Sequence, residues 1–271
     1  MTATVPVRHI ASRDNPDYRL WLRLAQGRPG HRESRVLLEG EHLCSAWLAH
    51  YGPPKALIVS EAIQAQSPGW IKPLWRQCES TRRIVLEDHL ARVLSQVEHG
   101  PAVFFLVDPP AAELPDQVTE GCLCLDRVQD PGNLGTLLRT AAAAGLAAAF
   151  LSPGCAAAWS PKVLRSGQGA HFAIRIHEHV DLLALRPRLR VPLAATTLDD
   201  AGSLYRQDLS RPCAWLFGNE GRGVADELLK VADWRVHIPQ SAGVESLNVA
   251  AAAAVCLFEQ RRQQDGRPDA Q

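Results

Sequence analysis

The sequence predicts an α/β protein with two domains, a small α/β domain followed by a larger domain built on a parallel sheet. From residue 122 onward, short apolar runs alternate with segments of helical periodicity, which is typical of a parallel sheet covered by helices on both faces. Residues 108–121 hold three prolines among polar residues, as a linker does. We therefore expect domains at 1–107 and 122–263, a linker at 108–121 and a disordered tail at 264–271.

The first domain is expected to mix helices and strands. Asp14-Asn15-Pro16 is a helix-start signal, because proline is favoured in the first helical turn. Gly40 precedes a second segment with apolar residues at helical spacing. Buried strands are expected at 36–38, 56–59, 83–86 and 102–107, and further helices at 71–77 and 89–97.

The second domain is expected to alternate strand and helix throughout. Strands are expected at 122–128, 147–151, 172–176, 192–196, 213–217 and 235–238. Helices are expected at 133–144, 161–169, 181–189, 225–232 and 247–263. Ligands of open parallel sheets bind at the carboxyl ends of the strands, so the loops that follow these strands are where functional residues are expected.

Charge excludes a protein that is basic throughout, since 29 Lys and Arg balance 29 Asp and Glu. Arginines nevertheless cluster in the first 35 residues. A local basic arm can hold phosphates on a neutral protein. The candidate nucleic-acid-binding residues of this arm, for RNA or DNA, are Arg13, Arg28, Arg32 and Arg35.

Cysteine spacing and hydropathy favour a cytoplasmic protein with reduced thiols. The seven cysteines include no Cys-x-x-Cys pair, which argues against a disulfide framework or a zinc ribbon. The alanine-rich stretches 140–150 and 249–257 are shorter than the roughly 18 apolar residues of a membrane helix. The first ten residues lack the apolar segment of a signal peptide.

The first candidate loop runs from Asp126 into the helix expected at 133–144. Asn133 is suited to cap that helix. Arg139 stands among leucines, threonines and alanines, where its planar fork can approach a phosphate or hydroxyl and hold two oxygens. A plain helix cap and a solvated arginine are the alternatives.

The second candidate loop is Gly218-Asn219-Glu220-Gly221-Arg222-Gly223, at the end of an apolar strand. Glycines allow the backbone to approach a ligand closely or to adopt positive φ. The spacing differs from the Gly-x-Gly-x-x-Gly of dinucleotide loops, which argues against a nicotinamide-dependent enzyme. A simple turn with a Glu220–Arg222 ion pair is the alternative.

The third candidate loop contains Ile238-Pro239 and Ser246-Leu247-Asn248 and leads into an alanine-rich helix. Small side chains permit that helix to pack closely against its neighbours. A capped core helix is the alternative, but it does not explain why Ser246 and Asn248 flank Leu247.

In this order the loops resemble the three motifs of the SpoU (TrmH) family, in the SPOUT class of RNA methyltransferases. Asn133 with Arg139 matches the first motif, residues 218–221 the second, and Ile238-Pro239 with Ser246-Leu247-Asn248 the third. The resemblance covers 123–259 and includes Ser160–Ser166. The first domain is similar to the family's substrate-binding domain through Ser12–Pro16 and Leu37–Gly40.

The resemblance implies methyl transfer from S-adenosylmethionine to a ribose 2′-hydroxyl of structured RNA, with rRNA preferred to tRNA. It also implies a trefoil knot in the C-terminal domain, a homodimer formed through that domain, and no membrane partner. The implied cofactor-binding residues are Thr196, Thr197, Gly218, Asn219, Gly221, Ile238, Pro239, Ser246 and Leu247. The implied catalytic residues are Asn133, Arg139, Glu220, Ser246 and Asn248, with Arg139 also contacting RNA.

The implied chemistry needs no metal, because a sulfonium methyl group is already activated. His177-Glu178-His179 lacks a third ligand nearby. Arginine stays protonated at ordinary pH and is a poor base, so we expect Arg139 to bind phosphate or stabilise the alkoxide while Glu220 or water accepts the proton. A tRNA 2′-O-methyltransferase and a non-catalytic RNA-binding protein on the same scaffold are the alternative functions.

Overall fold

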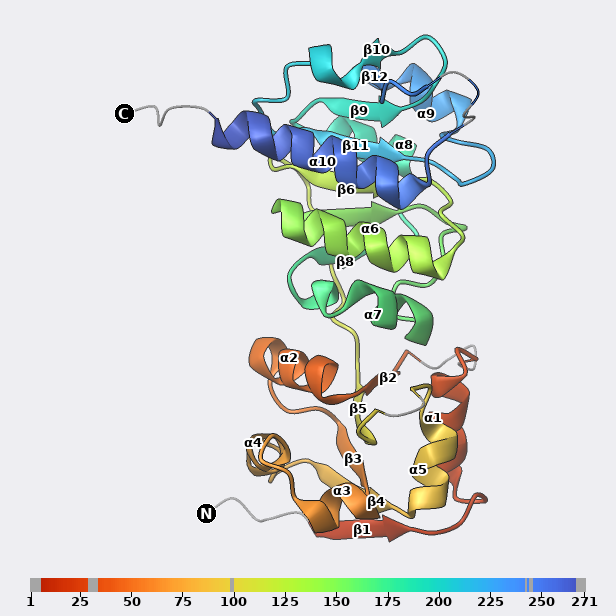
Figure 1. Cartoon of the computed structure of the whole chain (residues 1–271), viewed down its shortest axis with the longest axis vertical. Helices are drawn as coiled ribbons and strands as arrows, with labels where there is room; N and C mark the ends of the chain where they lie inside the picture. Colours follow the sequence, from red (N-terminus) through yellow and green to blue (C-terminus); the bar gives the residue numbers. More distant parts are fainter. Residues whose placement is uncertain (1–5, 29–33, 98–99, 242, 244–245, 267–271) are drawn as a thin grey trace. The chain divides into compact units, whose positions relative to one another are not determined.

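The computed structural model describes residues 6–28, 34–97, 100–241, 243 and 246–266 (Figure 1). The chain divides into two compact units, Met1–Ala111 with Trp159–Pro161, and Ala112–Ala158 with Lys162–Gln271. The linker expected at 108–121 includes the point where the chain passes from the first unit to the second. Among the described residues, no helix has the length and apolar character that a membrane crossing requires.

The first unit is built on a five-stranded mixed sheet in the order β1-β4-β3-β5-β2. Its strands are β1 (Val7–Ile10), β2 (Val36–Glu39), β3 (Ala56–Ser60), β4 (Arg82–Leu86) and β5 (Val103–Val107). β4 pairs in parallel with β1 and β3, whereas β5 runs antiparallel to β2 and β3. Every residue of β3 and β5 is buried, which accounts for their continuous apolar runs. β1 was not expected, because Arg8 and His9 at its centre are exposed and break the apolar pattern.

Five helices accompany this sheet: α1 (Pro16–Ala25), α2 (Glu41–Tyr51), α3 (Glu61–Gln66), α4 (Ile71–Gln77) and α5 (Asp88–Leu94). α1 begins as expected, since the Asn15 side chain accepts the backbone N–H groups of Asp17 and Tyr18. α3 was not expected, because it buries no residue and so has no apolar stripe. α5 ends three residues before the expected 97.

The second unit contains a seven-stranded, entirely parallel sheet in the order β10-β12-β9-β11-β6-β7-β8, as the alternating pattern predicts. Its strands are β6 (Cys122–Leu125), β7 (Ala148–Leu151), β8 (Arg175–His177), β9 (Leu193–Thr196), β10 (Gly202–Ser203), β11 (Ala214–Phe217) and β12 (Trp234–His237). The strand expected at 172–176 is misplaced, since a 3₁₀ turn, η1 (Ala170–Phe172), occupies its start.

The helices of this unit are α6 (Pro131–Ala144), α7 (Pro161–Gly167), α8 (Leu182–Leu185), α9 (Asp226–Lys230) and α10 (Val249–Asp265), with 3₁₀ turns η2 (Arg186–Arg188) and η3 (Leu204–Arg206). α6 begins two residues before the expected start. Asp130, not Asn133, is its N-cap, because the Asp130 carboxylate accepts the Asn133 N–H at 2.7 Å. α10 runs two residues into the expected tail, and residues 267–271 lie outside the described part.

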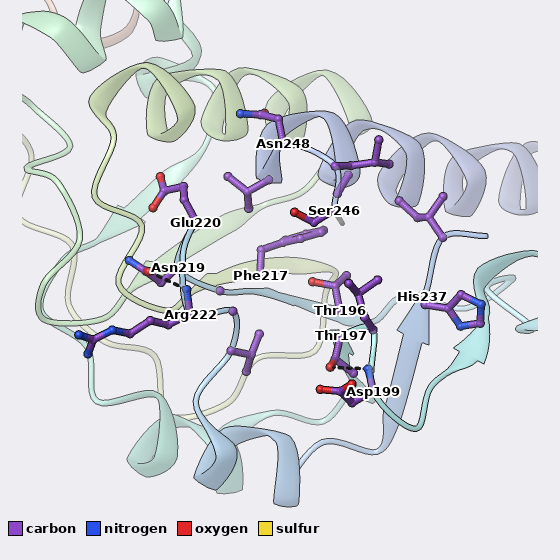
Figure 2. Close-up of a pocket in the computed structure, with 18 of the residues that line it drawn as sticks. Thr196, Thr197, Asp199, Phe217, Asn219, Glu220, Arg222, His237, Ser246 and Asn248 are labelled. Atoms are coloured by element: carbon purple, nitrogen blue, oxygen red, sulfur yellow. Dashed lines mark hydrogen bonds between the residues drawn. The ribbon is translucent and has the colours of Figure 1, made fainter. Parts of the chain in front are cut away.

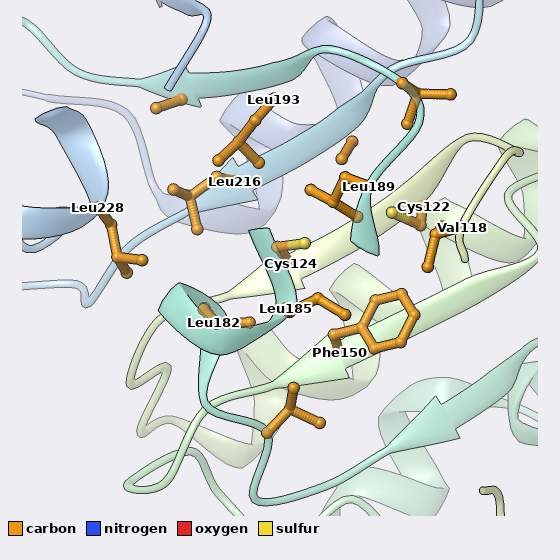
Figure 3. Packing of buried hydrophobic residues seen from close by; sticks show 14 of the residues in the cluster. Val118, Cys122, Cys124, Phe150, Leu182, Leu185, Leu189, Leu193, Leu216 and Leu228 are labelled. Atoms are coloured by element: carbon orange, nitrogen blue, oxygen red, sulfur yellow. The ribbon is translucent and has the colours of Figure 1, made fainter. Parts of the chain in front are cut away.

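Apolar layers on both faces of the parallel sheet hold these helices. On one face, Leu182 and Leu185 of α8 and Leu228 of α9 pack over strand residues that include Phe150 and Leu216 (Figure 3). α6 and α10 lie side by side over the sheet (Figure 1). α10 is fixed by a buried hydrogen bond from Trp215 Nε1 in β11 to Gln260 Oε1, at 2.8 Å.

This arrangement decides where the candidate loops meet. Because the strands are parallel, the carboxyl ends of β6, β9, β11 and β12 share one edge of the sheet. The first residues of α10 follow the loop after β12. The trefoil knot remains a prediction from the resemblance.

Candidate active site

A cavity of about 660 Å³ opens at this edge, among the loops that follow β9, β11 and β12 and the start of α10 (Figure 2). Its lining brings together most of the residues expected from the sequence: Asn133, Thr196, Thr197, Gly218, Asn219, Glu220, Gly221, Ile238, Ser246, Leu247 and Asn248. The three motif loops therefore form one site.

The loop after β11 is closed on itself. Asn219 and Gly223 exchange backbone hydrogen bonds at 3.0 and 2.8 Å, and Asn219 Oδ1 accepts the N–H groups of Gly221 and Arg222. A Cβ on Gly218 would lie 2.1 Å from the carbonyl carbon of Gly223, so no side chain fits there. Gly223 has φ +67°. These glycines are required by the fold of the loop itself.

Glu220 faces the first motif. Its carboxylate accepts the backbone N–H groups of Gln129 (3.2 Å) and Asp130 (3.1 Å) and the side-chain amide of Asn133 (3.1 Å). Among the described residues, Glu220 and Arg222 form no ion pair, so the alternative of a local pair is wrong. Burial raises the pKa of the Glu220 carboxyl, but the hydrogen bonds lower it further, leaving it below its ordinary value. Glu220 is therefore ionised near neutral pH and is a weak proton acceptor.

Asn248 connects the third motif to the first. Its Oδ1 accepts the N–H groups of Ala250 and Ala251 and caps α10, while its Nδ2 donates to Asn133 Oδ1 at 2.9 Å. Asn248 does cap α10, as the alternative of a capped helix predicts. The same side chain also joins two motifs, which a cap alone does not require.

The threonines that follow β9 are held by backbone groups. Thr196 Oγ1 donates to the carbonyl of Leu216 at 3.2 Å, and Thr197 Oγ1 accepts the N–H of Asp199 at 3.2 Å. Both threonines and Asp199 line the cavity (Figure 2).

Several lining residues were missed from the sequence: Leu198, Asp199, Phe217, Arg222, Asp226, His237 and Gln240. Asp199 follows an expected strand by three residues, so the strand-end rule could have found it. His237 Nδ1 donates to the carbonyl of Ala201 at 2.9 Å. Three acidic residues, Asp199, Glu220 and Asp226, line the cavity with one arginine, Arg222, and this balance suits a ligand that carries a positive charge.

Arg139 is not brought into the cavity. It is exposed on α6 and makes no hydrogen bond or ion pair with the described residues. Six residues at 100° each place it about 120° around the helix from Asn133. Pro239 is exposed and is also outside the lining.

The arginines expected to bind RNA belong to the first unit. Arg13 and Arg28 are exposed and Arg35 is half-buried, whereas Arg32 lies outside the described residues. In the described part of the chain, no group of three or more His, Cys, Asp or Glu side chains is arranged to hold a metal ion.

Comparison with known proteins identifies similar sequences over nearly the whole chain. Residues 121–258 match the model of the SpoU rRNA Methylase family. The chain is 34% identical to an uncharacterised tRNA/rRNA methyltransferase of Synechocystis, over 96% of each protein. It is 32% identical to the 23S rRNA (guanosine(2553)-2′-O)-methyltransferase of Bacillus subtilis, over 94% of this chain and all of that protein.

Two solved structures with bound S-adenosylmethionine have a similar fold. The rRNA methyltransferase from Sinorhizobium meliloti gives a TM-score of 0.81 at 27% identity, covering 94% of this chain and 98% of that one. The SpoU methyltransferase AviRb from Streptomyces viridochromogenes gives 0.80 at 26% identity, covering 94% and 100%.

Proposed function

This chain belongs to the SpoU rRNA methylase family, and on that premise we propose how its residues methylate RNA. It is an RNA 2′-O-methyltransferase that uses S-adenosylmethionine. The observation that carries the proposal is the convergence of the three motif loops on one cavity, through the hydrogen bonds from Asn248 to Asn133 and from Asn133 to Glu220.

The residues present fit the cofactor. The cavity, at about 660 Å³, lies within the range of about 300–1,000 Å³ usual for small-molecule sites. Asp199 and Asp226 in the lining suit a cationic ligand. We assign binding to the expected residues that line the cavity: Thr196, Thr197, Gly218, Asn219, Gly221, Ile238, Ser246 and Leu247. Pro239 is assigned no contact.

S-adenosylmethionine supplies a methyl group that its positive sulfur already activates. The protein then has to orient the ribose oxygen and remove its proton. We assign Glu220 a positioning role, because its low pKa makes it a weak base and its hydrogen bonds fix the turn that carries Asn133. Water accepts the proton, and the Arg139 guanidinium stabilises the developing alkoxide or holds a phosphate.

We propose rRNA, rather than tRNA, as the substrate. Relatives from Bacillus subtilis and Streptomyces viridochromogenes are 23S rRNA 2′-O-methyltransferases and align over at least 94% of this chain. The first unit would supply RNA affinity through Arg13, Arg28, Arg32 and Arg35, and this affinity should fall with added salt. The protein would act in the cytoplasm, which suits its seven free cysteines.

We further propose a homodimer formed through the outer face of α6 and α10. Gly132, Thr136, Arg139 and Ala143 lie at i, i+4, i+7 and i+11 on α6 and are exposed, and Phe258 of the adjacent α10 is 47% exposed. Small residues permit close helix approach, and an exposed Phe favours burial against a second copy. Arg139, which is outside its own cavity, would then act in the site of the second copy.

The reaction is tested by incubating the purified protein with radiolabelled S-adenosylmethionine and total RNA from cells that lack its gene. Nuclease mapping should locate the label on one ribose 2′-oxygen of rRNA. Label on tRNA would overturn the rRNA assignment. Cofactor binding without transfer to any RNA, including assembled ribosomal particles, would favour the non-catalytic alternative.

A further inference from the structure

A second, smaller cavity of about 180 Å³ adjoins the candidate active site. It is lined by Arg127, Gln129, Asn219 and Arg222, and it shares Asn219 and Arg222 with the larger cavity. Two arginines and two residues with side-chain amides line it, and no acidic residue does. Such a lining suits a small anion.

Arg127 is held in an unusual backbone conformation by three separate contacts. Its φ is +53°, in the left-handed region that non-glycine residues seldom adopt. Its N–H donates to Ser152 Oγ at 2.9 Å, and its carbonyl accepts Asn219 Nδ2 at 2.8 Å. Its guanidinium binds both oxygens of Asp126, each at 2.9 Å. Strained residues that are held this firmly cluster at functional sites.

The ion pair with Asp126 offsets the charge of Arg127, and Glu227 acts on the same guanidinium, but N–H groups of Arg127 stay available to a ligand. The Asp126 side chain is only 5% exposed and also accepts the N–H of Ala225 at 2.9 Å, so its charge is satisfied within the protein. The Arg127 side chain is 39% exposed. Because the pair uses only Nε and Nη2, the two hydrogens of Nη1 and one of Nη2 remain to donate.

Arg222 supplies the second cation of the cavity. It is exposed, makes no ion pair with the described residues, and has its backbone fixed by the bond to Asn219 Oδ1 at 3.1 Å. Its side chain extends past Asn219, away from Thr196 and Ser246 (Figure 2). It therefore points out of the part of the larger cavity that we assign to the cofactor.

We propose that Arg127 and Arg222 bind a phosphodiester group of the RNA substrate. This inference rests on the proposed function and adds to it an RNA contact beside the cofactor site. At about 180 Å³ the cavity is smaller than the roughly 300 Å³ at which small-molecule sites begin, so it suits one phosphate group. The carboxylate of the cofactor shares this chemistry, but Arg127 and Gln129 line only the smaller cavity.

Salt dependence of RNA binding tests this site without relying on catalysis. The probe is a fluorescent single-stranded oligouridylate, because phosphate contacts do not depend on sequence. Arg222→Gln should make the negative slope of log K against log[KCl] shallower by about 0.7, the value for one phosphate of a single strand. Arg222→Lys should keep most of the slope because it keeps the charge. Calorimetry should find S-adenosylmethionine affinity unchanged in both variants.

The matched control is Arg211→Gln. Arg211 is also exposed, but it lies before β11, at the opposite end of the strand from the site. The slope of log K against log[KCl] for Arg211→Gln should equal that of the wild type. Arg127→Gln is a second test, monitored by circular dichroism, because it leaves Asp126 buried without its partner.

Each remaining outcome overturns the phosphate site. The first is an Arg222→Gln slope equal to that of Arg211→Gln, and the second is a wild type that does not bind the oligouridylate. The third is an Arg222→Gln variant that loses cofactor affinity at an unchanged slope, which would assign Arg222 to the cofactor carboxylate. Whether the wild type transfers methyl groups to RNA is measured separately. A failure there would count against the proposed function, while the slopes still decide the phosphate site.

Discussion

Asn133 and Glu220, 87 positions apart in the chain, are joined by a hydrogen bond of 3.1 Å from the amide nitrogen of the first to a carboxylate oxygen of the second. The cap of α10 determines which atom of Asn133 donates in this bond. Asn248 Oδ1 accepts two N–H groups of α10, so its Nδ2 must donate to Asn133 Oδ1, which leaves the Asn133 amide nitrogen for Glu220. The three motif loops thus orient one another.

The two roles of Asn248 can be separated by substitution. Asn248→Ala removes both the cap and the amide donor, and should lower the free energy of unfolding by about 1 kcal/mol. Asn248→Ser keeps a capping oxygen and should cost less stability. Both should slow methyl transfer on the order of 100-fold, because Asn133 loses its orientation. Denaturant unfolding and single-turnover rates measure the two effects. A fully active serine variant would show that the bond to Asn133 is not needed.

Arg139 should matter for turnover but not for cofactor binding. Arg139→Ala and Arg139→Lys should both abolish methyl transfer, because neither side chain reproduces the planar guanidinium. The affinity for S-adenosylmethionine should stay unchanged, because Arg139 lies outside the cavity of its own chain. Calorimetry and transfer assays check this. Full activity of Arg139→Lys would contradict a role that depends on the geometry of the guanidinium.

Co-expression of two inactive variants tests whether Arg139 acts across the proposed dimer. In a mixture of Arg139→Ala with Asn133→Ala, half of the dimers are mixed and each holds one complete site. About a quarter of wild-type activity should therefore return. Each variant expressed alone is the control. No recovery in a mixture that sediments as a dimer would place Arg139 in its own site or outside catalysis.

Gly135→Ala should destabilise the protein although alanine is the better helix former. A Cβ there would lie 2.6 Å from the carbonyl oxygen of Val163 and 2.8 Å from the N of Gly167, both in α7. This overlap should cost about 1–3 kcal/mol, which exceeds the gain of about 1 kcal/mol in helix propensity. Gly69→Ala is the control, since nothing lies within 4 Å of its Cβ position and its φ is not positive. Equal unfolding midpoints for the two variants would refute the close approach of the helices.

His171 should make stability depend on pH. Burial lowers its pKa from 6.5 to about 4, although the hydrogen bond to the Ala158 carbonyl (2.8 Å) opposes the shift. The folded state then binds fewer protons than the unfolded state between these two values. Its contribution is complete above pH 6.5 and is lost as the pH falls toward 4, on the order of 3 kcal/mol in all.

The control is His171→Gln, which keeps an N–H donor but does not titrate. Chemical denaturation from pH 7.5 to about 4.5 should give a flatter curve for this variant than for the wild type. Parallel curves would show that His171 does not carry the dependence.

Much of the local structure follows from the sequence, because buried strands require apolar runs and helix starts require particular residues within a few positions. The fully buried strands β3, β5, β6 and β11 were expected near their observed positions, and α4 matches its expected range. Asn15 precedes a proline and caps α1 as that signal predicts. Strand β1 was missed, since its exposed Arg8 and His9 leave no apolar run and only its pairing with β4 makes it a strand.

The sequence also determined which loops carry the site, through the order of three motifs and the glycines of the second. Only the tertiary structure decided how those residues act on one another. Asp130 caps α6 by accepting the N–H of Asn133, whereas Asn133, the third residue of the helix, is bound through its side chain to Asn248 and Glu220. The tertiary structure likewise placed Arg139 outside the larger cavity and brought Arg127 and Arg222 to the lining of the same small cavity. The physical reason is that periodicity and turn chemistry act over a few neighbouring residues, whereas these contacts join segments about 90 to 115 positions apart, which only the packing of the parallel sheet brings together.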